Sequence, residues 1–232
     1  MPRYSHISVV IPTRNETAEL PETLRRLRTV PEIAEIIVSD GASTDGTRDL
    51  ARQLGCRVIE GALGRGAQLR IAAQAASADV VWMVHADTWV TADSGQALLR
   101  TLARPGIVGG AFWKVFRDPH WLMRGSRWRC WTRLHFFGRL AADQALFVPR
   151  PVLEQIGGVP DMPLMEEFEL CKRLRRLGRL ALAPAVVQTS ARRWHEHGVI
   201  RTYLKMWRIT AAYTLGATPE RLAQLYDPKN AN

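Results

Sequence analysis

The first half of the chain alternates short apolar runs with segments of helical spacing, four times in succession. The runs cover residues 5–12, 35–39, 57–60 and 80–84, and the helical segments cover residues 17–30, 47–54, 67–76 and 94–102. This alternation predicts an α/β fold, in which a mostly parallel, Rossmann-like sheet carries helices on both faces. Such sheets bind ligands beyond the carboxyl ends of their strands, so we expect a site in the segments that leave these four runs.

The second half is less regular. Residues 110–116 and 144–149 are predicted as further strands, with a basic aromatic segment between them. Residues 151–156, 166–177 and 199–215 are predicted as helices, and a last short helix starts at Pro219 after the N-cap Thr218. A chain of 232 residues without repeats suits one domain.

Charge and cysteine content limit the compartment and the partners. Residues 1–12 contain only a short apolar run, too brief for a signal peptide or a spanning helix. Cys56, Cys130 and Cys171 are odd in number and widely spaced, which is typical of reduced thiols, so we expect a cytoplasmic protein. A net charge of +10 favours a phosphorylated ligand, anionic lipid or nucleic acid, without choosing among them.

Three of the strand-end segments carry residues suited to a phosphorylated ligand. Asp40 could accept hydrogen bonds from a uracil ring or a ribose, or cap its own turn. Residues 61–66 (GALGRG) precede a helix, where backbone N–H groups and Arg65 could approach phosphate oxygens, although a simple turn is the alternative. Asp87 follows the fourth run, where a cation bridging two phosphates needs an oxygen ligand; a structural turn is again the alternative.

Two adjacent acidic residues, Glu166 and Glu167, begin one predicted helix, where the helix dipole stabilises negative charge whatever their role. Neighbouring residues lie about 100° apart around a helix. We therefore expect only one of the two to point squarely into a site and to supply one base.

The order of these motifs is similar to that of a known family. Residues 7–16 (ISVVIPTRNE) and 38–47 (VSDGASTDGT) resemble the opening of glycosyltransferase family 2. Further motifs resemble a compact bacterial subfamily described as radical-SAM/selenodomain-associated transferases; they are GRGAQL at 64–69, VHADT at 84–88, ADQ at 142–144, GG at 157–158 and PLMEE at 163–167. The resemblance covers nearly the whole chain and implies a GT-A fold with C-terminal helices.

The resemblance also implies roles for particular residues. It implies a nucleotide-diphosphate sugar donor, with a UDP-sugar as the first expectation, bound by Pro12, Thr13, Arg14, Glu16, Asp40, Gly64, Arg65, Gln68 and Asp87. It implies Mn²⁺ or Mg²⁺ on Asp87, with Glu167 or Glu166 as the base of a single inverting displacement. Two departures stand out: most relatives have aspartate where this chain has His85, and aspartate where it has Glu167.

Residues 192–197 (RRWHEH) resemble the segment in which processive relatives carry QxxRW. Ser190 stands where the glutamine would be, which disfavours a processive polymerase. His85 and either His195 or His197 could add metal ligands, with His197 the preferred candidate because it precedes Gly198; solvent-facing histidines are the alternative.

Two segments combine aromatic and basic residues. Residues 112–139 have seven Lys and Arg against Asp118, a balance of +6, interleaved with eight Trp and Phe. This mixture suits an anionic membrane surface, a lipid-linked or phosphorylated acceptor, single-stranded nucleic acid, or ordinary packing. Residues 199–215 predict an amphipathic helix too charged to span a bilayer, which leaves peripheral attachment to the inner face of the cytoplasmic membrane, packing on the sheet or a homodimer.

We therefore expect one GT-A domain that moves a sugar to an unknown acceptor. Residues 1–104 would bind the donor, residues 105–198 would hold the acceptor and the base, and residues 199–232 would form C-terminal helices. Two alternatives stay open. One is a nucleotidyltransferase that makes sugar nucleotides, disfavoured because no GxGxRL follows the first strand. The other is an inactive scaffold that binds anionic lipid or, as the less favoured partner, nucleic acid.

Overall fold

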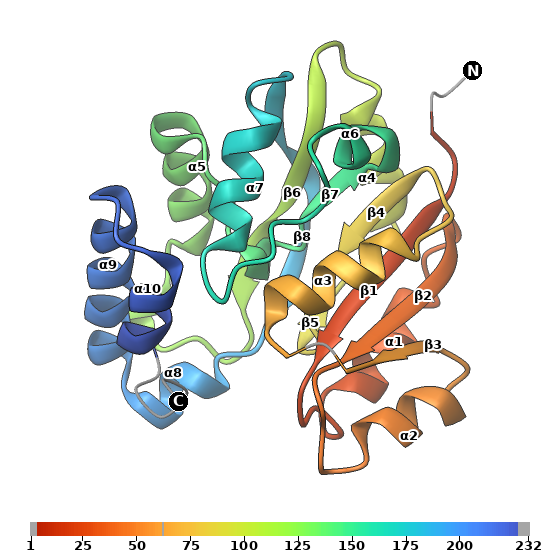
Figure 1. Ribbon diagram of the computed structural model, residues 1–232, viewed down its shortest axis with the longest axis horizontal. Coiled ribbons are helices and arrows are strands. Elements are labelled where there is room, and N and C mark those ends of the chain that lie inside the picture. Colours follow the sequence, from red (N-terminus) through yellow and green to blue (C-terminus); the bar gives the residue numbers. More distant parts are fainter. Residues whose placement is uncertain (1–3, 62, 227–232) are drawn as a thin grey trace.

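The computed structural model describes residues 4–61 and 63–226, which form one eight-stranded sheet with helices around it (Figure 1). The strand order is β3-β2-β1-β4-β7-β6-β8-β5. The strands are β1 (Ile7–Thr13), β2 (Ile33–Asp40), β3 (Arg57–Glu60), β4 (Val80–Met83), β5 (Thr88–Trp89), β6 (Ile107–Phe116), β7 (Phe147–Pro149) and β8 (Arg179–Thr189). The helices are α1 (Leu20–Leu27), α2 (Thr47–Gln53), α3 (Arg65–Gln74), α4 (Ser94–Leu102), α5 (Ser126–Phe137), α6 (Arg150–Gln155), α7 (Glu166–Leu174), α8 (Arg192–His197), α9 (Val199–Thr214) and α10 (Pro219–Tyr226), with single turns η1 (Trp121–Met123) and η2 (Ala142–Gln144).

The four predicted β–α units are confirmed and build the parallel half of the sheet. Strand β1 pairs in parallel with β2 and with β4, and β2 pairs in parallel with β3. The carboxyl ends of these strands therefore meet at one edge, as the alternation of the sequence predicts. Thr13, the last residue of β1, is directly opposite Asp40, the last residue of β2.

The second half adds antiparallel pairs. Strand β7 runs antiparallel to its neighbours β4 and β6, and the short β5 runs antiparallel to β8. Strands β6 and β8 are parallel, so the predicted mostly parallel sheet is confirmed. Strand β8 was not predicted because its sequence, RLALAPAVVQT, has an internal proline and few β-branched residues.

The basic aromatic segment contains a helix that the sequence analysis did not predict. Arginine and tryptophan alternate along α5 and hide a helical stripe of buried residues. Its ends are nonetheless marked, because Gly125 and Gly138 flank it with φ of 80° and 61°. Glycine in this left-handed conformation commonly ends a helix, so Gly138 is the signal that could have located the end of α5.

The core lies on both faces of the sheet, as predicted. Alternate residues of β1 and β4 point to opposite faces: Val9 joins the cluster under α1 and α4, whereas Val10 joins the cluster under α3, α6 and α7. In Figure 1, α3 and α7 cross in front of the strands. The helices α9 and α10 pack through Ile209 and Leu222 against Met165 and Phe168 at the start of α7.

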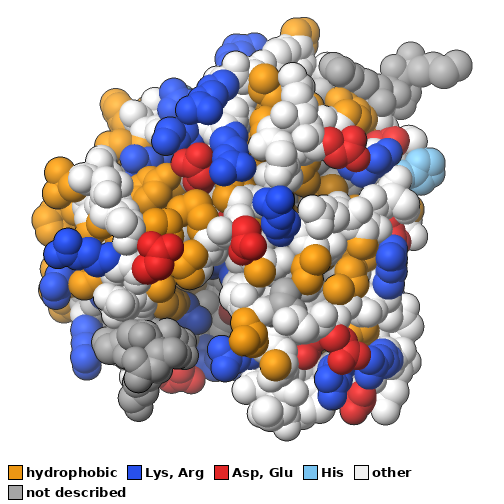
Figure 2. All heavy atoms as spheres, viewed as in Figure 1, with side chains coloured by type: hydrophobic (Ala, Val, Ile, Leu, Met, Phe, Trp, Pro, Cys, Tyr) orange, Lys and Arg blue, Asp and Glu red, His pale blue; other side chains and the backbone are white. Residues whose placement is uncertain are grey.

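Outside this core, hydrophobic side chains are exposed among basic ones around α5, α7 and α9 (Figure 2). In the described part of the chain, every helix is too short or too polar to cross a bilayer.

Candidate active site

The floor of the site is braced by hydrogen bonds between the ends of β1 and β2. Asp40 is 1% exposed, and its carboxylate accepts hydrogen bonds from the Thr13 hydroxyl at 3.2 Å and from the Ser43 amide at 2.9 Å. The Ser43 hydroxyl donates a third at 2.5 Å. The side-chain amide of Gln68, on α3, donates to the carbonyls of Thr13 and Ser39 at 2.8 and 2.6 Å. Asp40 therefore caps its turn, and Gln68 holds the two strands together.

Because Gln68 supplies both donors to buried carbonyls, Gln68→Ala is expected to reduce the free energy of unfolding by about 1–3 kcal/mol. Urea denaturation followed by circular dichroism measures the change. Gln53→Ala, at an exposed position of α2, is the control and should change it by less than about 0.5 kcal/mol. Equal effects of the two substitutions would contradict the bracing role of Gln68.

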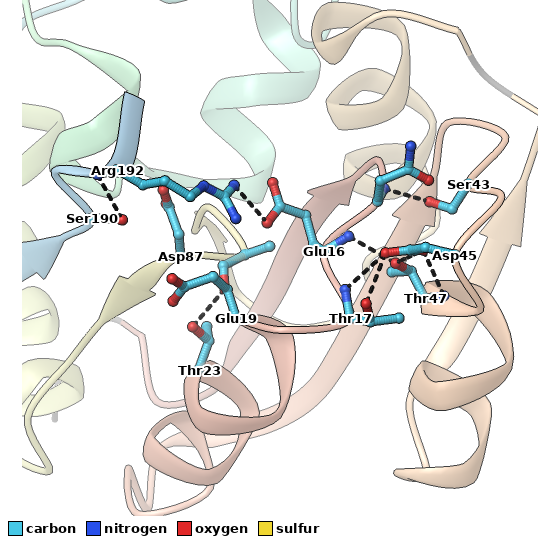
Figure 3. A network of polar contacts seen from close by, with 12 residues as sticks. Glu16, Thr17, Glu19, Thr23, Ser43, Asp45, Thr47, Asp87, Ser190 and Arg192 are labelled. Carbon is cyan, nitrogen blue, oxygen red and sulfur yellow. Dashed lines mark hydrogen bonds and ion pairs between the residues drawn. The ribbon is translucent and has the colours of Figure 1, made fainter. Parts of the chain in front are cut away.

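At the mouth of the site, acidic residues from two segments, the β1–α1 connection and the β4–β5 connection, lie near Arg192. Figure 3 shows Glu16, Glu19 and Asp87 gathered near Arg192, the first residue of α8. The Arg192 guanidinium lies 3.5 Å from a Glu16 carboxylate oxygen. Burial raises the pKa of Glu16, Arg192 lowers it in part, and the nearby Asp87 raises it again. Arg117 links two of these residues, because its guanidinium donates to the carbonyl of Asp87 at 3.1 Å and to the carboxylate of Glu19 at 2.7 Å.

Arg192 was not among the predicted site residues. The segment RRWHEH predicted a role for its histidines, whereas its first arginine, Arg192, lies beside Glu16, 176 positions away in the sequence. With Ser190 at the glutamine position, the arginine that aligns with QxxRW is Arg193, so the motif itself does not point to this contact of Arg192.

Deeper in the site, Arg65 joins Glu166 and Glu167, the two adjacent acidic residues that begin α7. Its Nε contacts Glu166, and its Nη2 lies 3.0 Å from Glu167 Oε2. Both glutamates and His85 line one narrow cavity of about 10 Å³, space for about one water molecule. The expectation that only one glutamate reaches the site is therefore wrong, because the forked guanidinium draws both side chains to the same side. Arg65 was also expected to turn toward phosphate oxygens, but in the structure its guanidinium pairs with Glu166 and Glu167.

The pKa of Glu167 is raised to about 7, first by burial and then by the adjacent charge of Glu166, while Arg65 opposes the rise. A carboxylate whose pKa lies near neutrality is partly ionised at the operating pH and is basic enough to remove a proton from a hydroxyl group. The pKa of Cys171, on the same helix, is raised to about 12 by burial, so its thiol does not compete as a base.

Three buried polar atoms around this cavity have no hydrogen-bond partner among the described residues; they are His85 Nε2, Asp143 Oδ1 and Glu166 Oε2. The other oxygen of Asp143 pairs with Lys114 Nζ at 2.6 Å. Burial and then Arg65 lower the pKa of His85, which keeps its imidazole neutral. Buried polar groups of folded proteins are almost always paired, so unpaired atoms of this kind mark the place of a water molecule or a ligand hydroxyl.

The predicted metal residues are only partly gathered. No three Asp, Glu, His or Cys side chains in the described ranges are grouped closely enough to hold a metal, so Asp87, His85 and His197 do not form one cage. His195 points its Nε2 at the carbonyl of Asp118, 3.0 Å away, and His197 is exposed on α8. Asp87 and the unpaired nitrogen of His85 are nonetheless suitable donors for a cation that completes its shell with diphosphate oxygens and water.

The remaining residues predicted to bind the sugar donor lie along the same edge of the sheet. Arg14 is exposed after β1, Pro12 is half-buried, and Gly64 is the exposed residue before α3 with φ of 91°. Ala62, within the glycine-rich segment, lies outside the described residues. The donor contacts of all these residues stay a prediction.

Comparisons with known proteins agree with this architecture. Over 52 residues the chain is 44% identical to 4,4'-diaponeurosporenoate glycosyltransferase of Staphylococcus haemolyticus (strain JCSC1435), which is 22% of this chain and 14% of that one. Among solved structures, S. aureus TarS 1-349 in complex with UDP-GlcNAc has a TM-score of 0.66 at 14% identity, over 80% of this chain and 58% of that one. The mannosyltransferase PcManGT of Pyrobaculum calidifontis, in complex with GDP-Man and Mn²⁺, has a TM-score of 0.65 at 19% identity, over 100% of this chain and 66% of that one.

The chain thus spans 14% of that curated relative and less than two thirds of each of these two solved structures. At these identities the structural likeness concerns the fold, and it confirms the predicted GT-A architecture. The family described as Glycosyl transferase family 2 matches residues 8–149. Because this match covers more than half of the 232 residues, the chain belongs to glycosyltransferase family 2.

Proposed function

We propose that this protein transfers a sugar from a nucleoside-diphosphate sugar to a hydroxyl group of an acceptor, with inversion at the anomeric carbon. The observation that carries the proposal is Glu167, whose pKa is raised to about 7 and whose carboxylate lines a cavity at the carboxyl edge of the sheet. Two similar structures contain UDP-GlcNAc and GDP-Man, which supports a nucleotide-sugar donor. A UDP-sugar is the donor that we propose to test first.

In the proposed reaction, Glu167 accepts the proton of the acceptor hydroxyl as its oxygen attacks the anomeric carbon. The bond to the nucleoside diphosphate breaks on the opposite face, which inverts the configuration. Arg65, which also pairs with Glu166, holds the Glu167 carboxylate in place. Arg192, beside Asp87 at the mouth of the site, is placed to contact the negative charge of the leaving diphosphate.

Asp87 is the residue that we propose for the divalent cation, with the His85 nitrogen as a second donor. When bound, Mn²⁺ or Mg²⁺ would neutralise charge on the diphosphate. The Mn²⁺ in the PcManGT structure supports this choice. The described residues do not bring three such side chains together, and His197 is exposed on α8, so diphosphate oxygens and water would complete the shell.

Calorimetric titration of UDP, UDP-glucose, UDP-N-acetylglucosamine, GDP and GDP-mannose, with and without Mn²⁺, tests the donor site. We expect one nucleotide to bind in a Mn²⁺-dependent manner. Asp87→Ala should weaken that binding at least about tenfold, because the protein offers few ligands to the cation and this substitution removes the carboxylate among them. Asp49→Ala, on the exposed surface of α2, makes the same charge change and should bind normally.

Retention of binding in Asp87→Ala would place the cation elsewhere. Failure of every nucleotide to bind would favour an inactive scaffold, and release of pyrophosphate from a nucleoside triphosphate and a sugar phosphate would favour a nucleotidyltransferase. The acceptor that we propose is a lipid-linked or phosphorylated hydroxyl compound, since the half of the chain from residue 105 to 198 that would hold it is rich in arginine. The narrower radical-SAM/selenodomain-associated subfamily remains part of this proposal.

A further inference from the structure

Outside the site, the helices α5 and α9 lie side by side and carry exposed hydrophobic side chains. Arg129 of α5 lies over the ring of Tyr203 of α9 at 5.3 Å. At the other end of the pair, Arg139, just beyond α5, donates to the hydroxyl of Thr214, the last residue of α9, at 3.1 Å. These contacts join matching ends, so the two helices run in the same direction.

We name the exposed side of this pair the aromatic–basic face. Its apolar members are 58–72% exposed and come from η1, α5 and α9; they are Trp121, Trp128, Phe136, Phe137, Ile200, Leu204 and Trp207. Figure 2 shows hydrophobic side chains together with basic ones along the margin of the molecule that α5 and α9 form in Figure 1. Exposed apolar patches of this kind on a folded protein mark a surface that docks on something else.

The charge of the face is one-sided. Helices α5 and α9 contain six Lys and Arg residues, Arg127, Arg129, Arg133, Arg201, Lys205 and Arg208, and neither helix contains Asp or Glu. Arg133 is turned inward, where it donates to Gln144 Oε1 at 3.1 Å, so it does not add to the charge of the face. On α9, Ile200, Leu204 and Trp207 follow the i, i+4, i+7 spacing of one helical stripe, and each is followed directly by a basic residue. Apolar side chains beside a row of lysine and arginine are typical of helices that lie in the interface of an anionic bilayer.

The aromatic ladder on α5 fits the same surroundings. Trp128 stacks on Trp131 at 5.1 Å between ring centroids, and Trp131 meets Phe136 edge-on at 5.9 Å. Tryptophan is enriched at the headgroup level of membranes, because its ring is apolar and its N–H is polar. The stacking also holds the exposed rings in place before any partner binds.

From these observations we infer that the aromatic–basic face docks the protein on an anionic lipid bilayer. The face lies beside the candidate active site: α9 follows α8 directly, and α8 carries Arg192 next to Glu16. Docking through this face would therefore hold the mouth of the site close to the membrane surface. The inference rests on exposure and charge and does not depend on the proposed sugar transfer.

Two other occupants fit the face less well. A symmetric pair of copies would bring two arginine-rich surfaces with no acidic residue on α5 or α9 against each other, which is electrostatically unfavourable. Single-stranded nucleic acid would use aromatic rings for stacking, but two of the three members of the apolar stripe on α9 are Ile200 and Leu204, which offer no stacking surface.

Co-sedimentation with phosphatidylcholine vesicles, with and without phosphatidylglycerol, tests the inference. We expect binding to the anionic vesicles alone, weakened by salt. The variant Leu204→Gln/Trp207→Gln should bind at least about tenfold more weakly, since it loses two inserted side chains. Both residues are more than half exposed, so the fold should be unaffected, which a thermal melt verifies. The control Leu177→Gln changes an exposed leucine after α7 that is not a member of the face.

A second pair of variants separates the face from the net charge. Arg201→Gln/Arg208→Gln should weaken vesicle binding by about fivefold for each charge removed. Arg104→Gln/Arg176→Gln removes the same charge from exposed positions elsewhere and should bind like the unaltered protein. Equal losses in both pairs, or no binding to anionic vesicles, would overturn the inference. So would a dimer that Leu204→Gln/Trp207→Gln dissociates, or tighter binding to single-stranded RNA than to vesicles that the same variant loses.

Discussion

Glu167→Gln is expected to reduce the rate of sugar transfer by a factor of about 10²–10⁴, the usual contribution of a general base, while donor binding stays within about twofold. Glutamine has the same shape but cannot accept the proton of the acceptor hydroxyl. Steady-state kinetics with the donor identified by calorimetry measures the rate. Glu169→Gln is the matched control, because Glu169 lies on the same helix and pairs with Arg173 on the outer side.

The pH dependence gives an independent check. In the unaltered protein, the rate should rise with pH through about 7, since Glu167 must be ionised to act and its pKa is raised to about 7 by burial and by Glu166. Glu167→Gln should remove this rise, and Glu169→Gln should keep it. A rate that is independent of pH between 5 and 8, roughly the range in which such a group titrates, would contradict the assignment of the base.

The same substitution should stabilise the folded protein at pH 8. Because the folded-state pKa of Glu167 lies above its ordinary value of 4.5, the folded protein holds its proton more tightly than the unfolded chain does. The ionised carboxylate therefore costs stability, and the cost grows between pH 4.5 and about 7 and is constant above that. Glu167→Gln should raise the free energy of unfolding at pH 8 by on the order of 3 kcal/mol and have little effect at pH 4.

The second large effect concerns Arg65. Arg65→Met is expected to lower the free energy of unfolding by about 3–5 kcal/mol, the cost of leaving buried charge without its partner. Glu166 is 1% exposed and would lose the guanidinium that pairs with it. Urea denaturation measures the loss. Arg70→Met, on the same helix, is the control, because Arg70 donates one hydrogen bond to a carbonyl at 3.2 Å and forms no ion pair within the described ranges.

Arg65 should also set the pH profile of the reaction. Its charge lowers the pKa of Glu167, so its removal should shift the rise in rate to higher pH. Arg65→Lys keeps the positive charge but loses the forked guanidinium that contacts both glutamates. It should lower the free energy of unfolding less than Arg65→Met does and shift the pH profile less. An unchanged profile in both variants would show that the pairing is structural and leaves the base unaffected.

The sequence predicted the structure best where the pattern of an element depends on the local burial of that element alone. The strand and helix periods of residues 5–102 predicted β1 to β4 and α1 to α4, since each period reflects burial on one or two faces of a single element. The four elements β8, α5, α8 and β5 were not predicted. Their sequences are short, or mix proline, arginine and tryptophan in ways that no single period describes.

The sequence by itself determined that the chain is an α/β protein, that polar residues follow its parallel strands, and that an acidic pair begins a helix. Only the tertiary structure decided which of these residues meet. In the fold, the loop before α7 packs closely on Gly66 at the start of α3, so that Arg65 pairs with Glu166 and Glu167 across 101 and 102 positions. The physical reason is that local patterns reflect the burial of each element, whereas pairing of distant side chains depends on how the elements order themselves in the sheet.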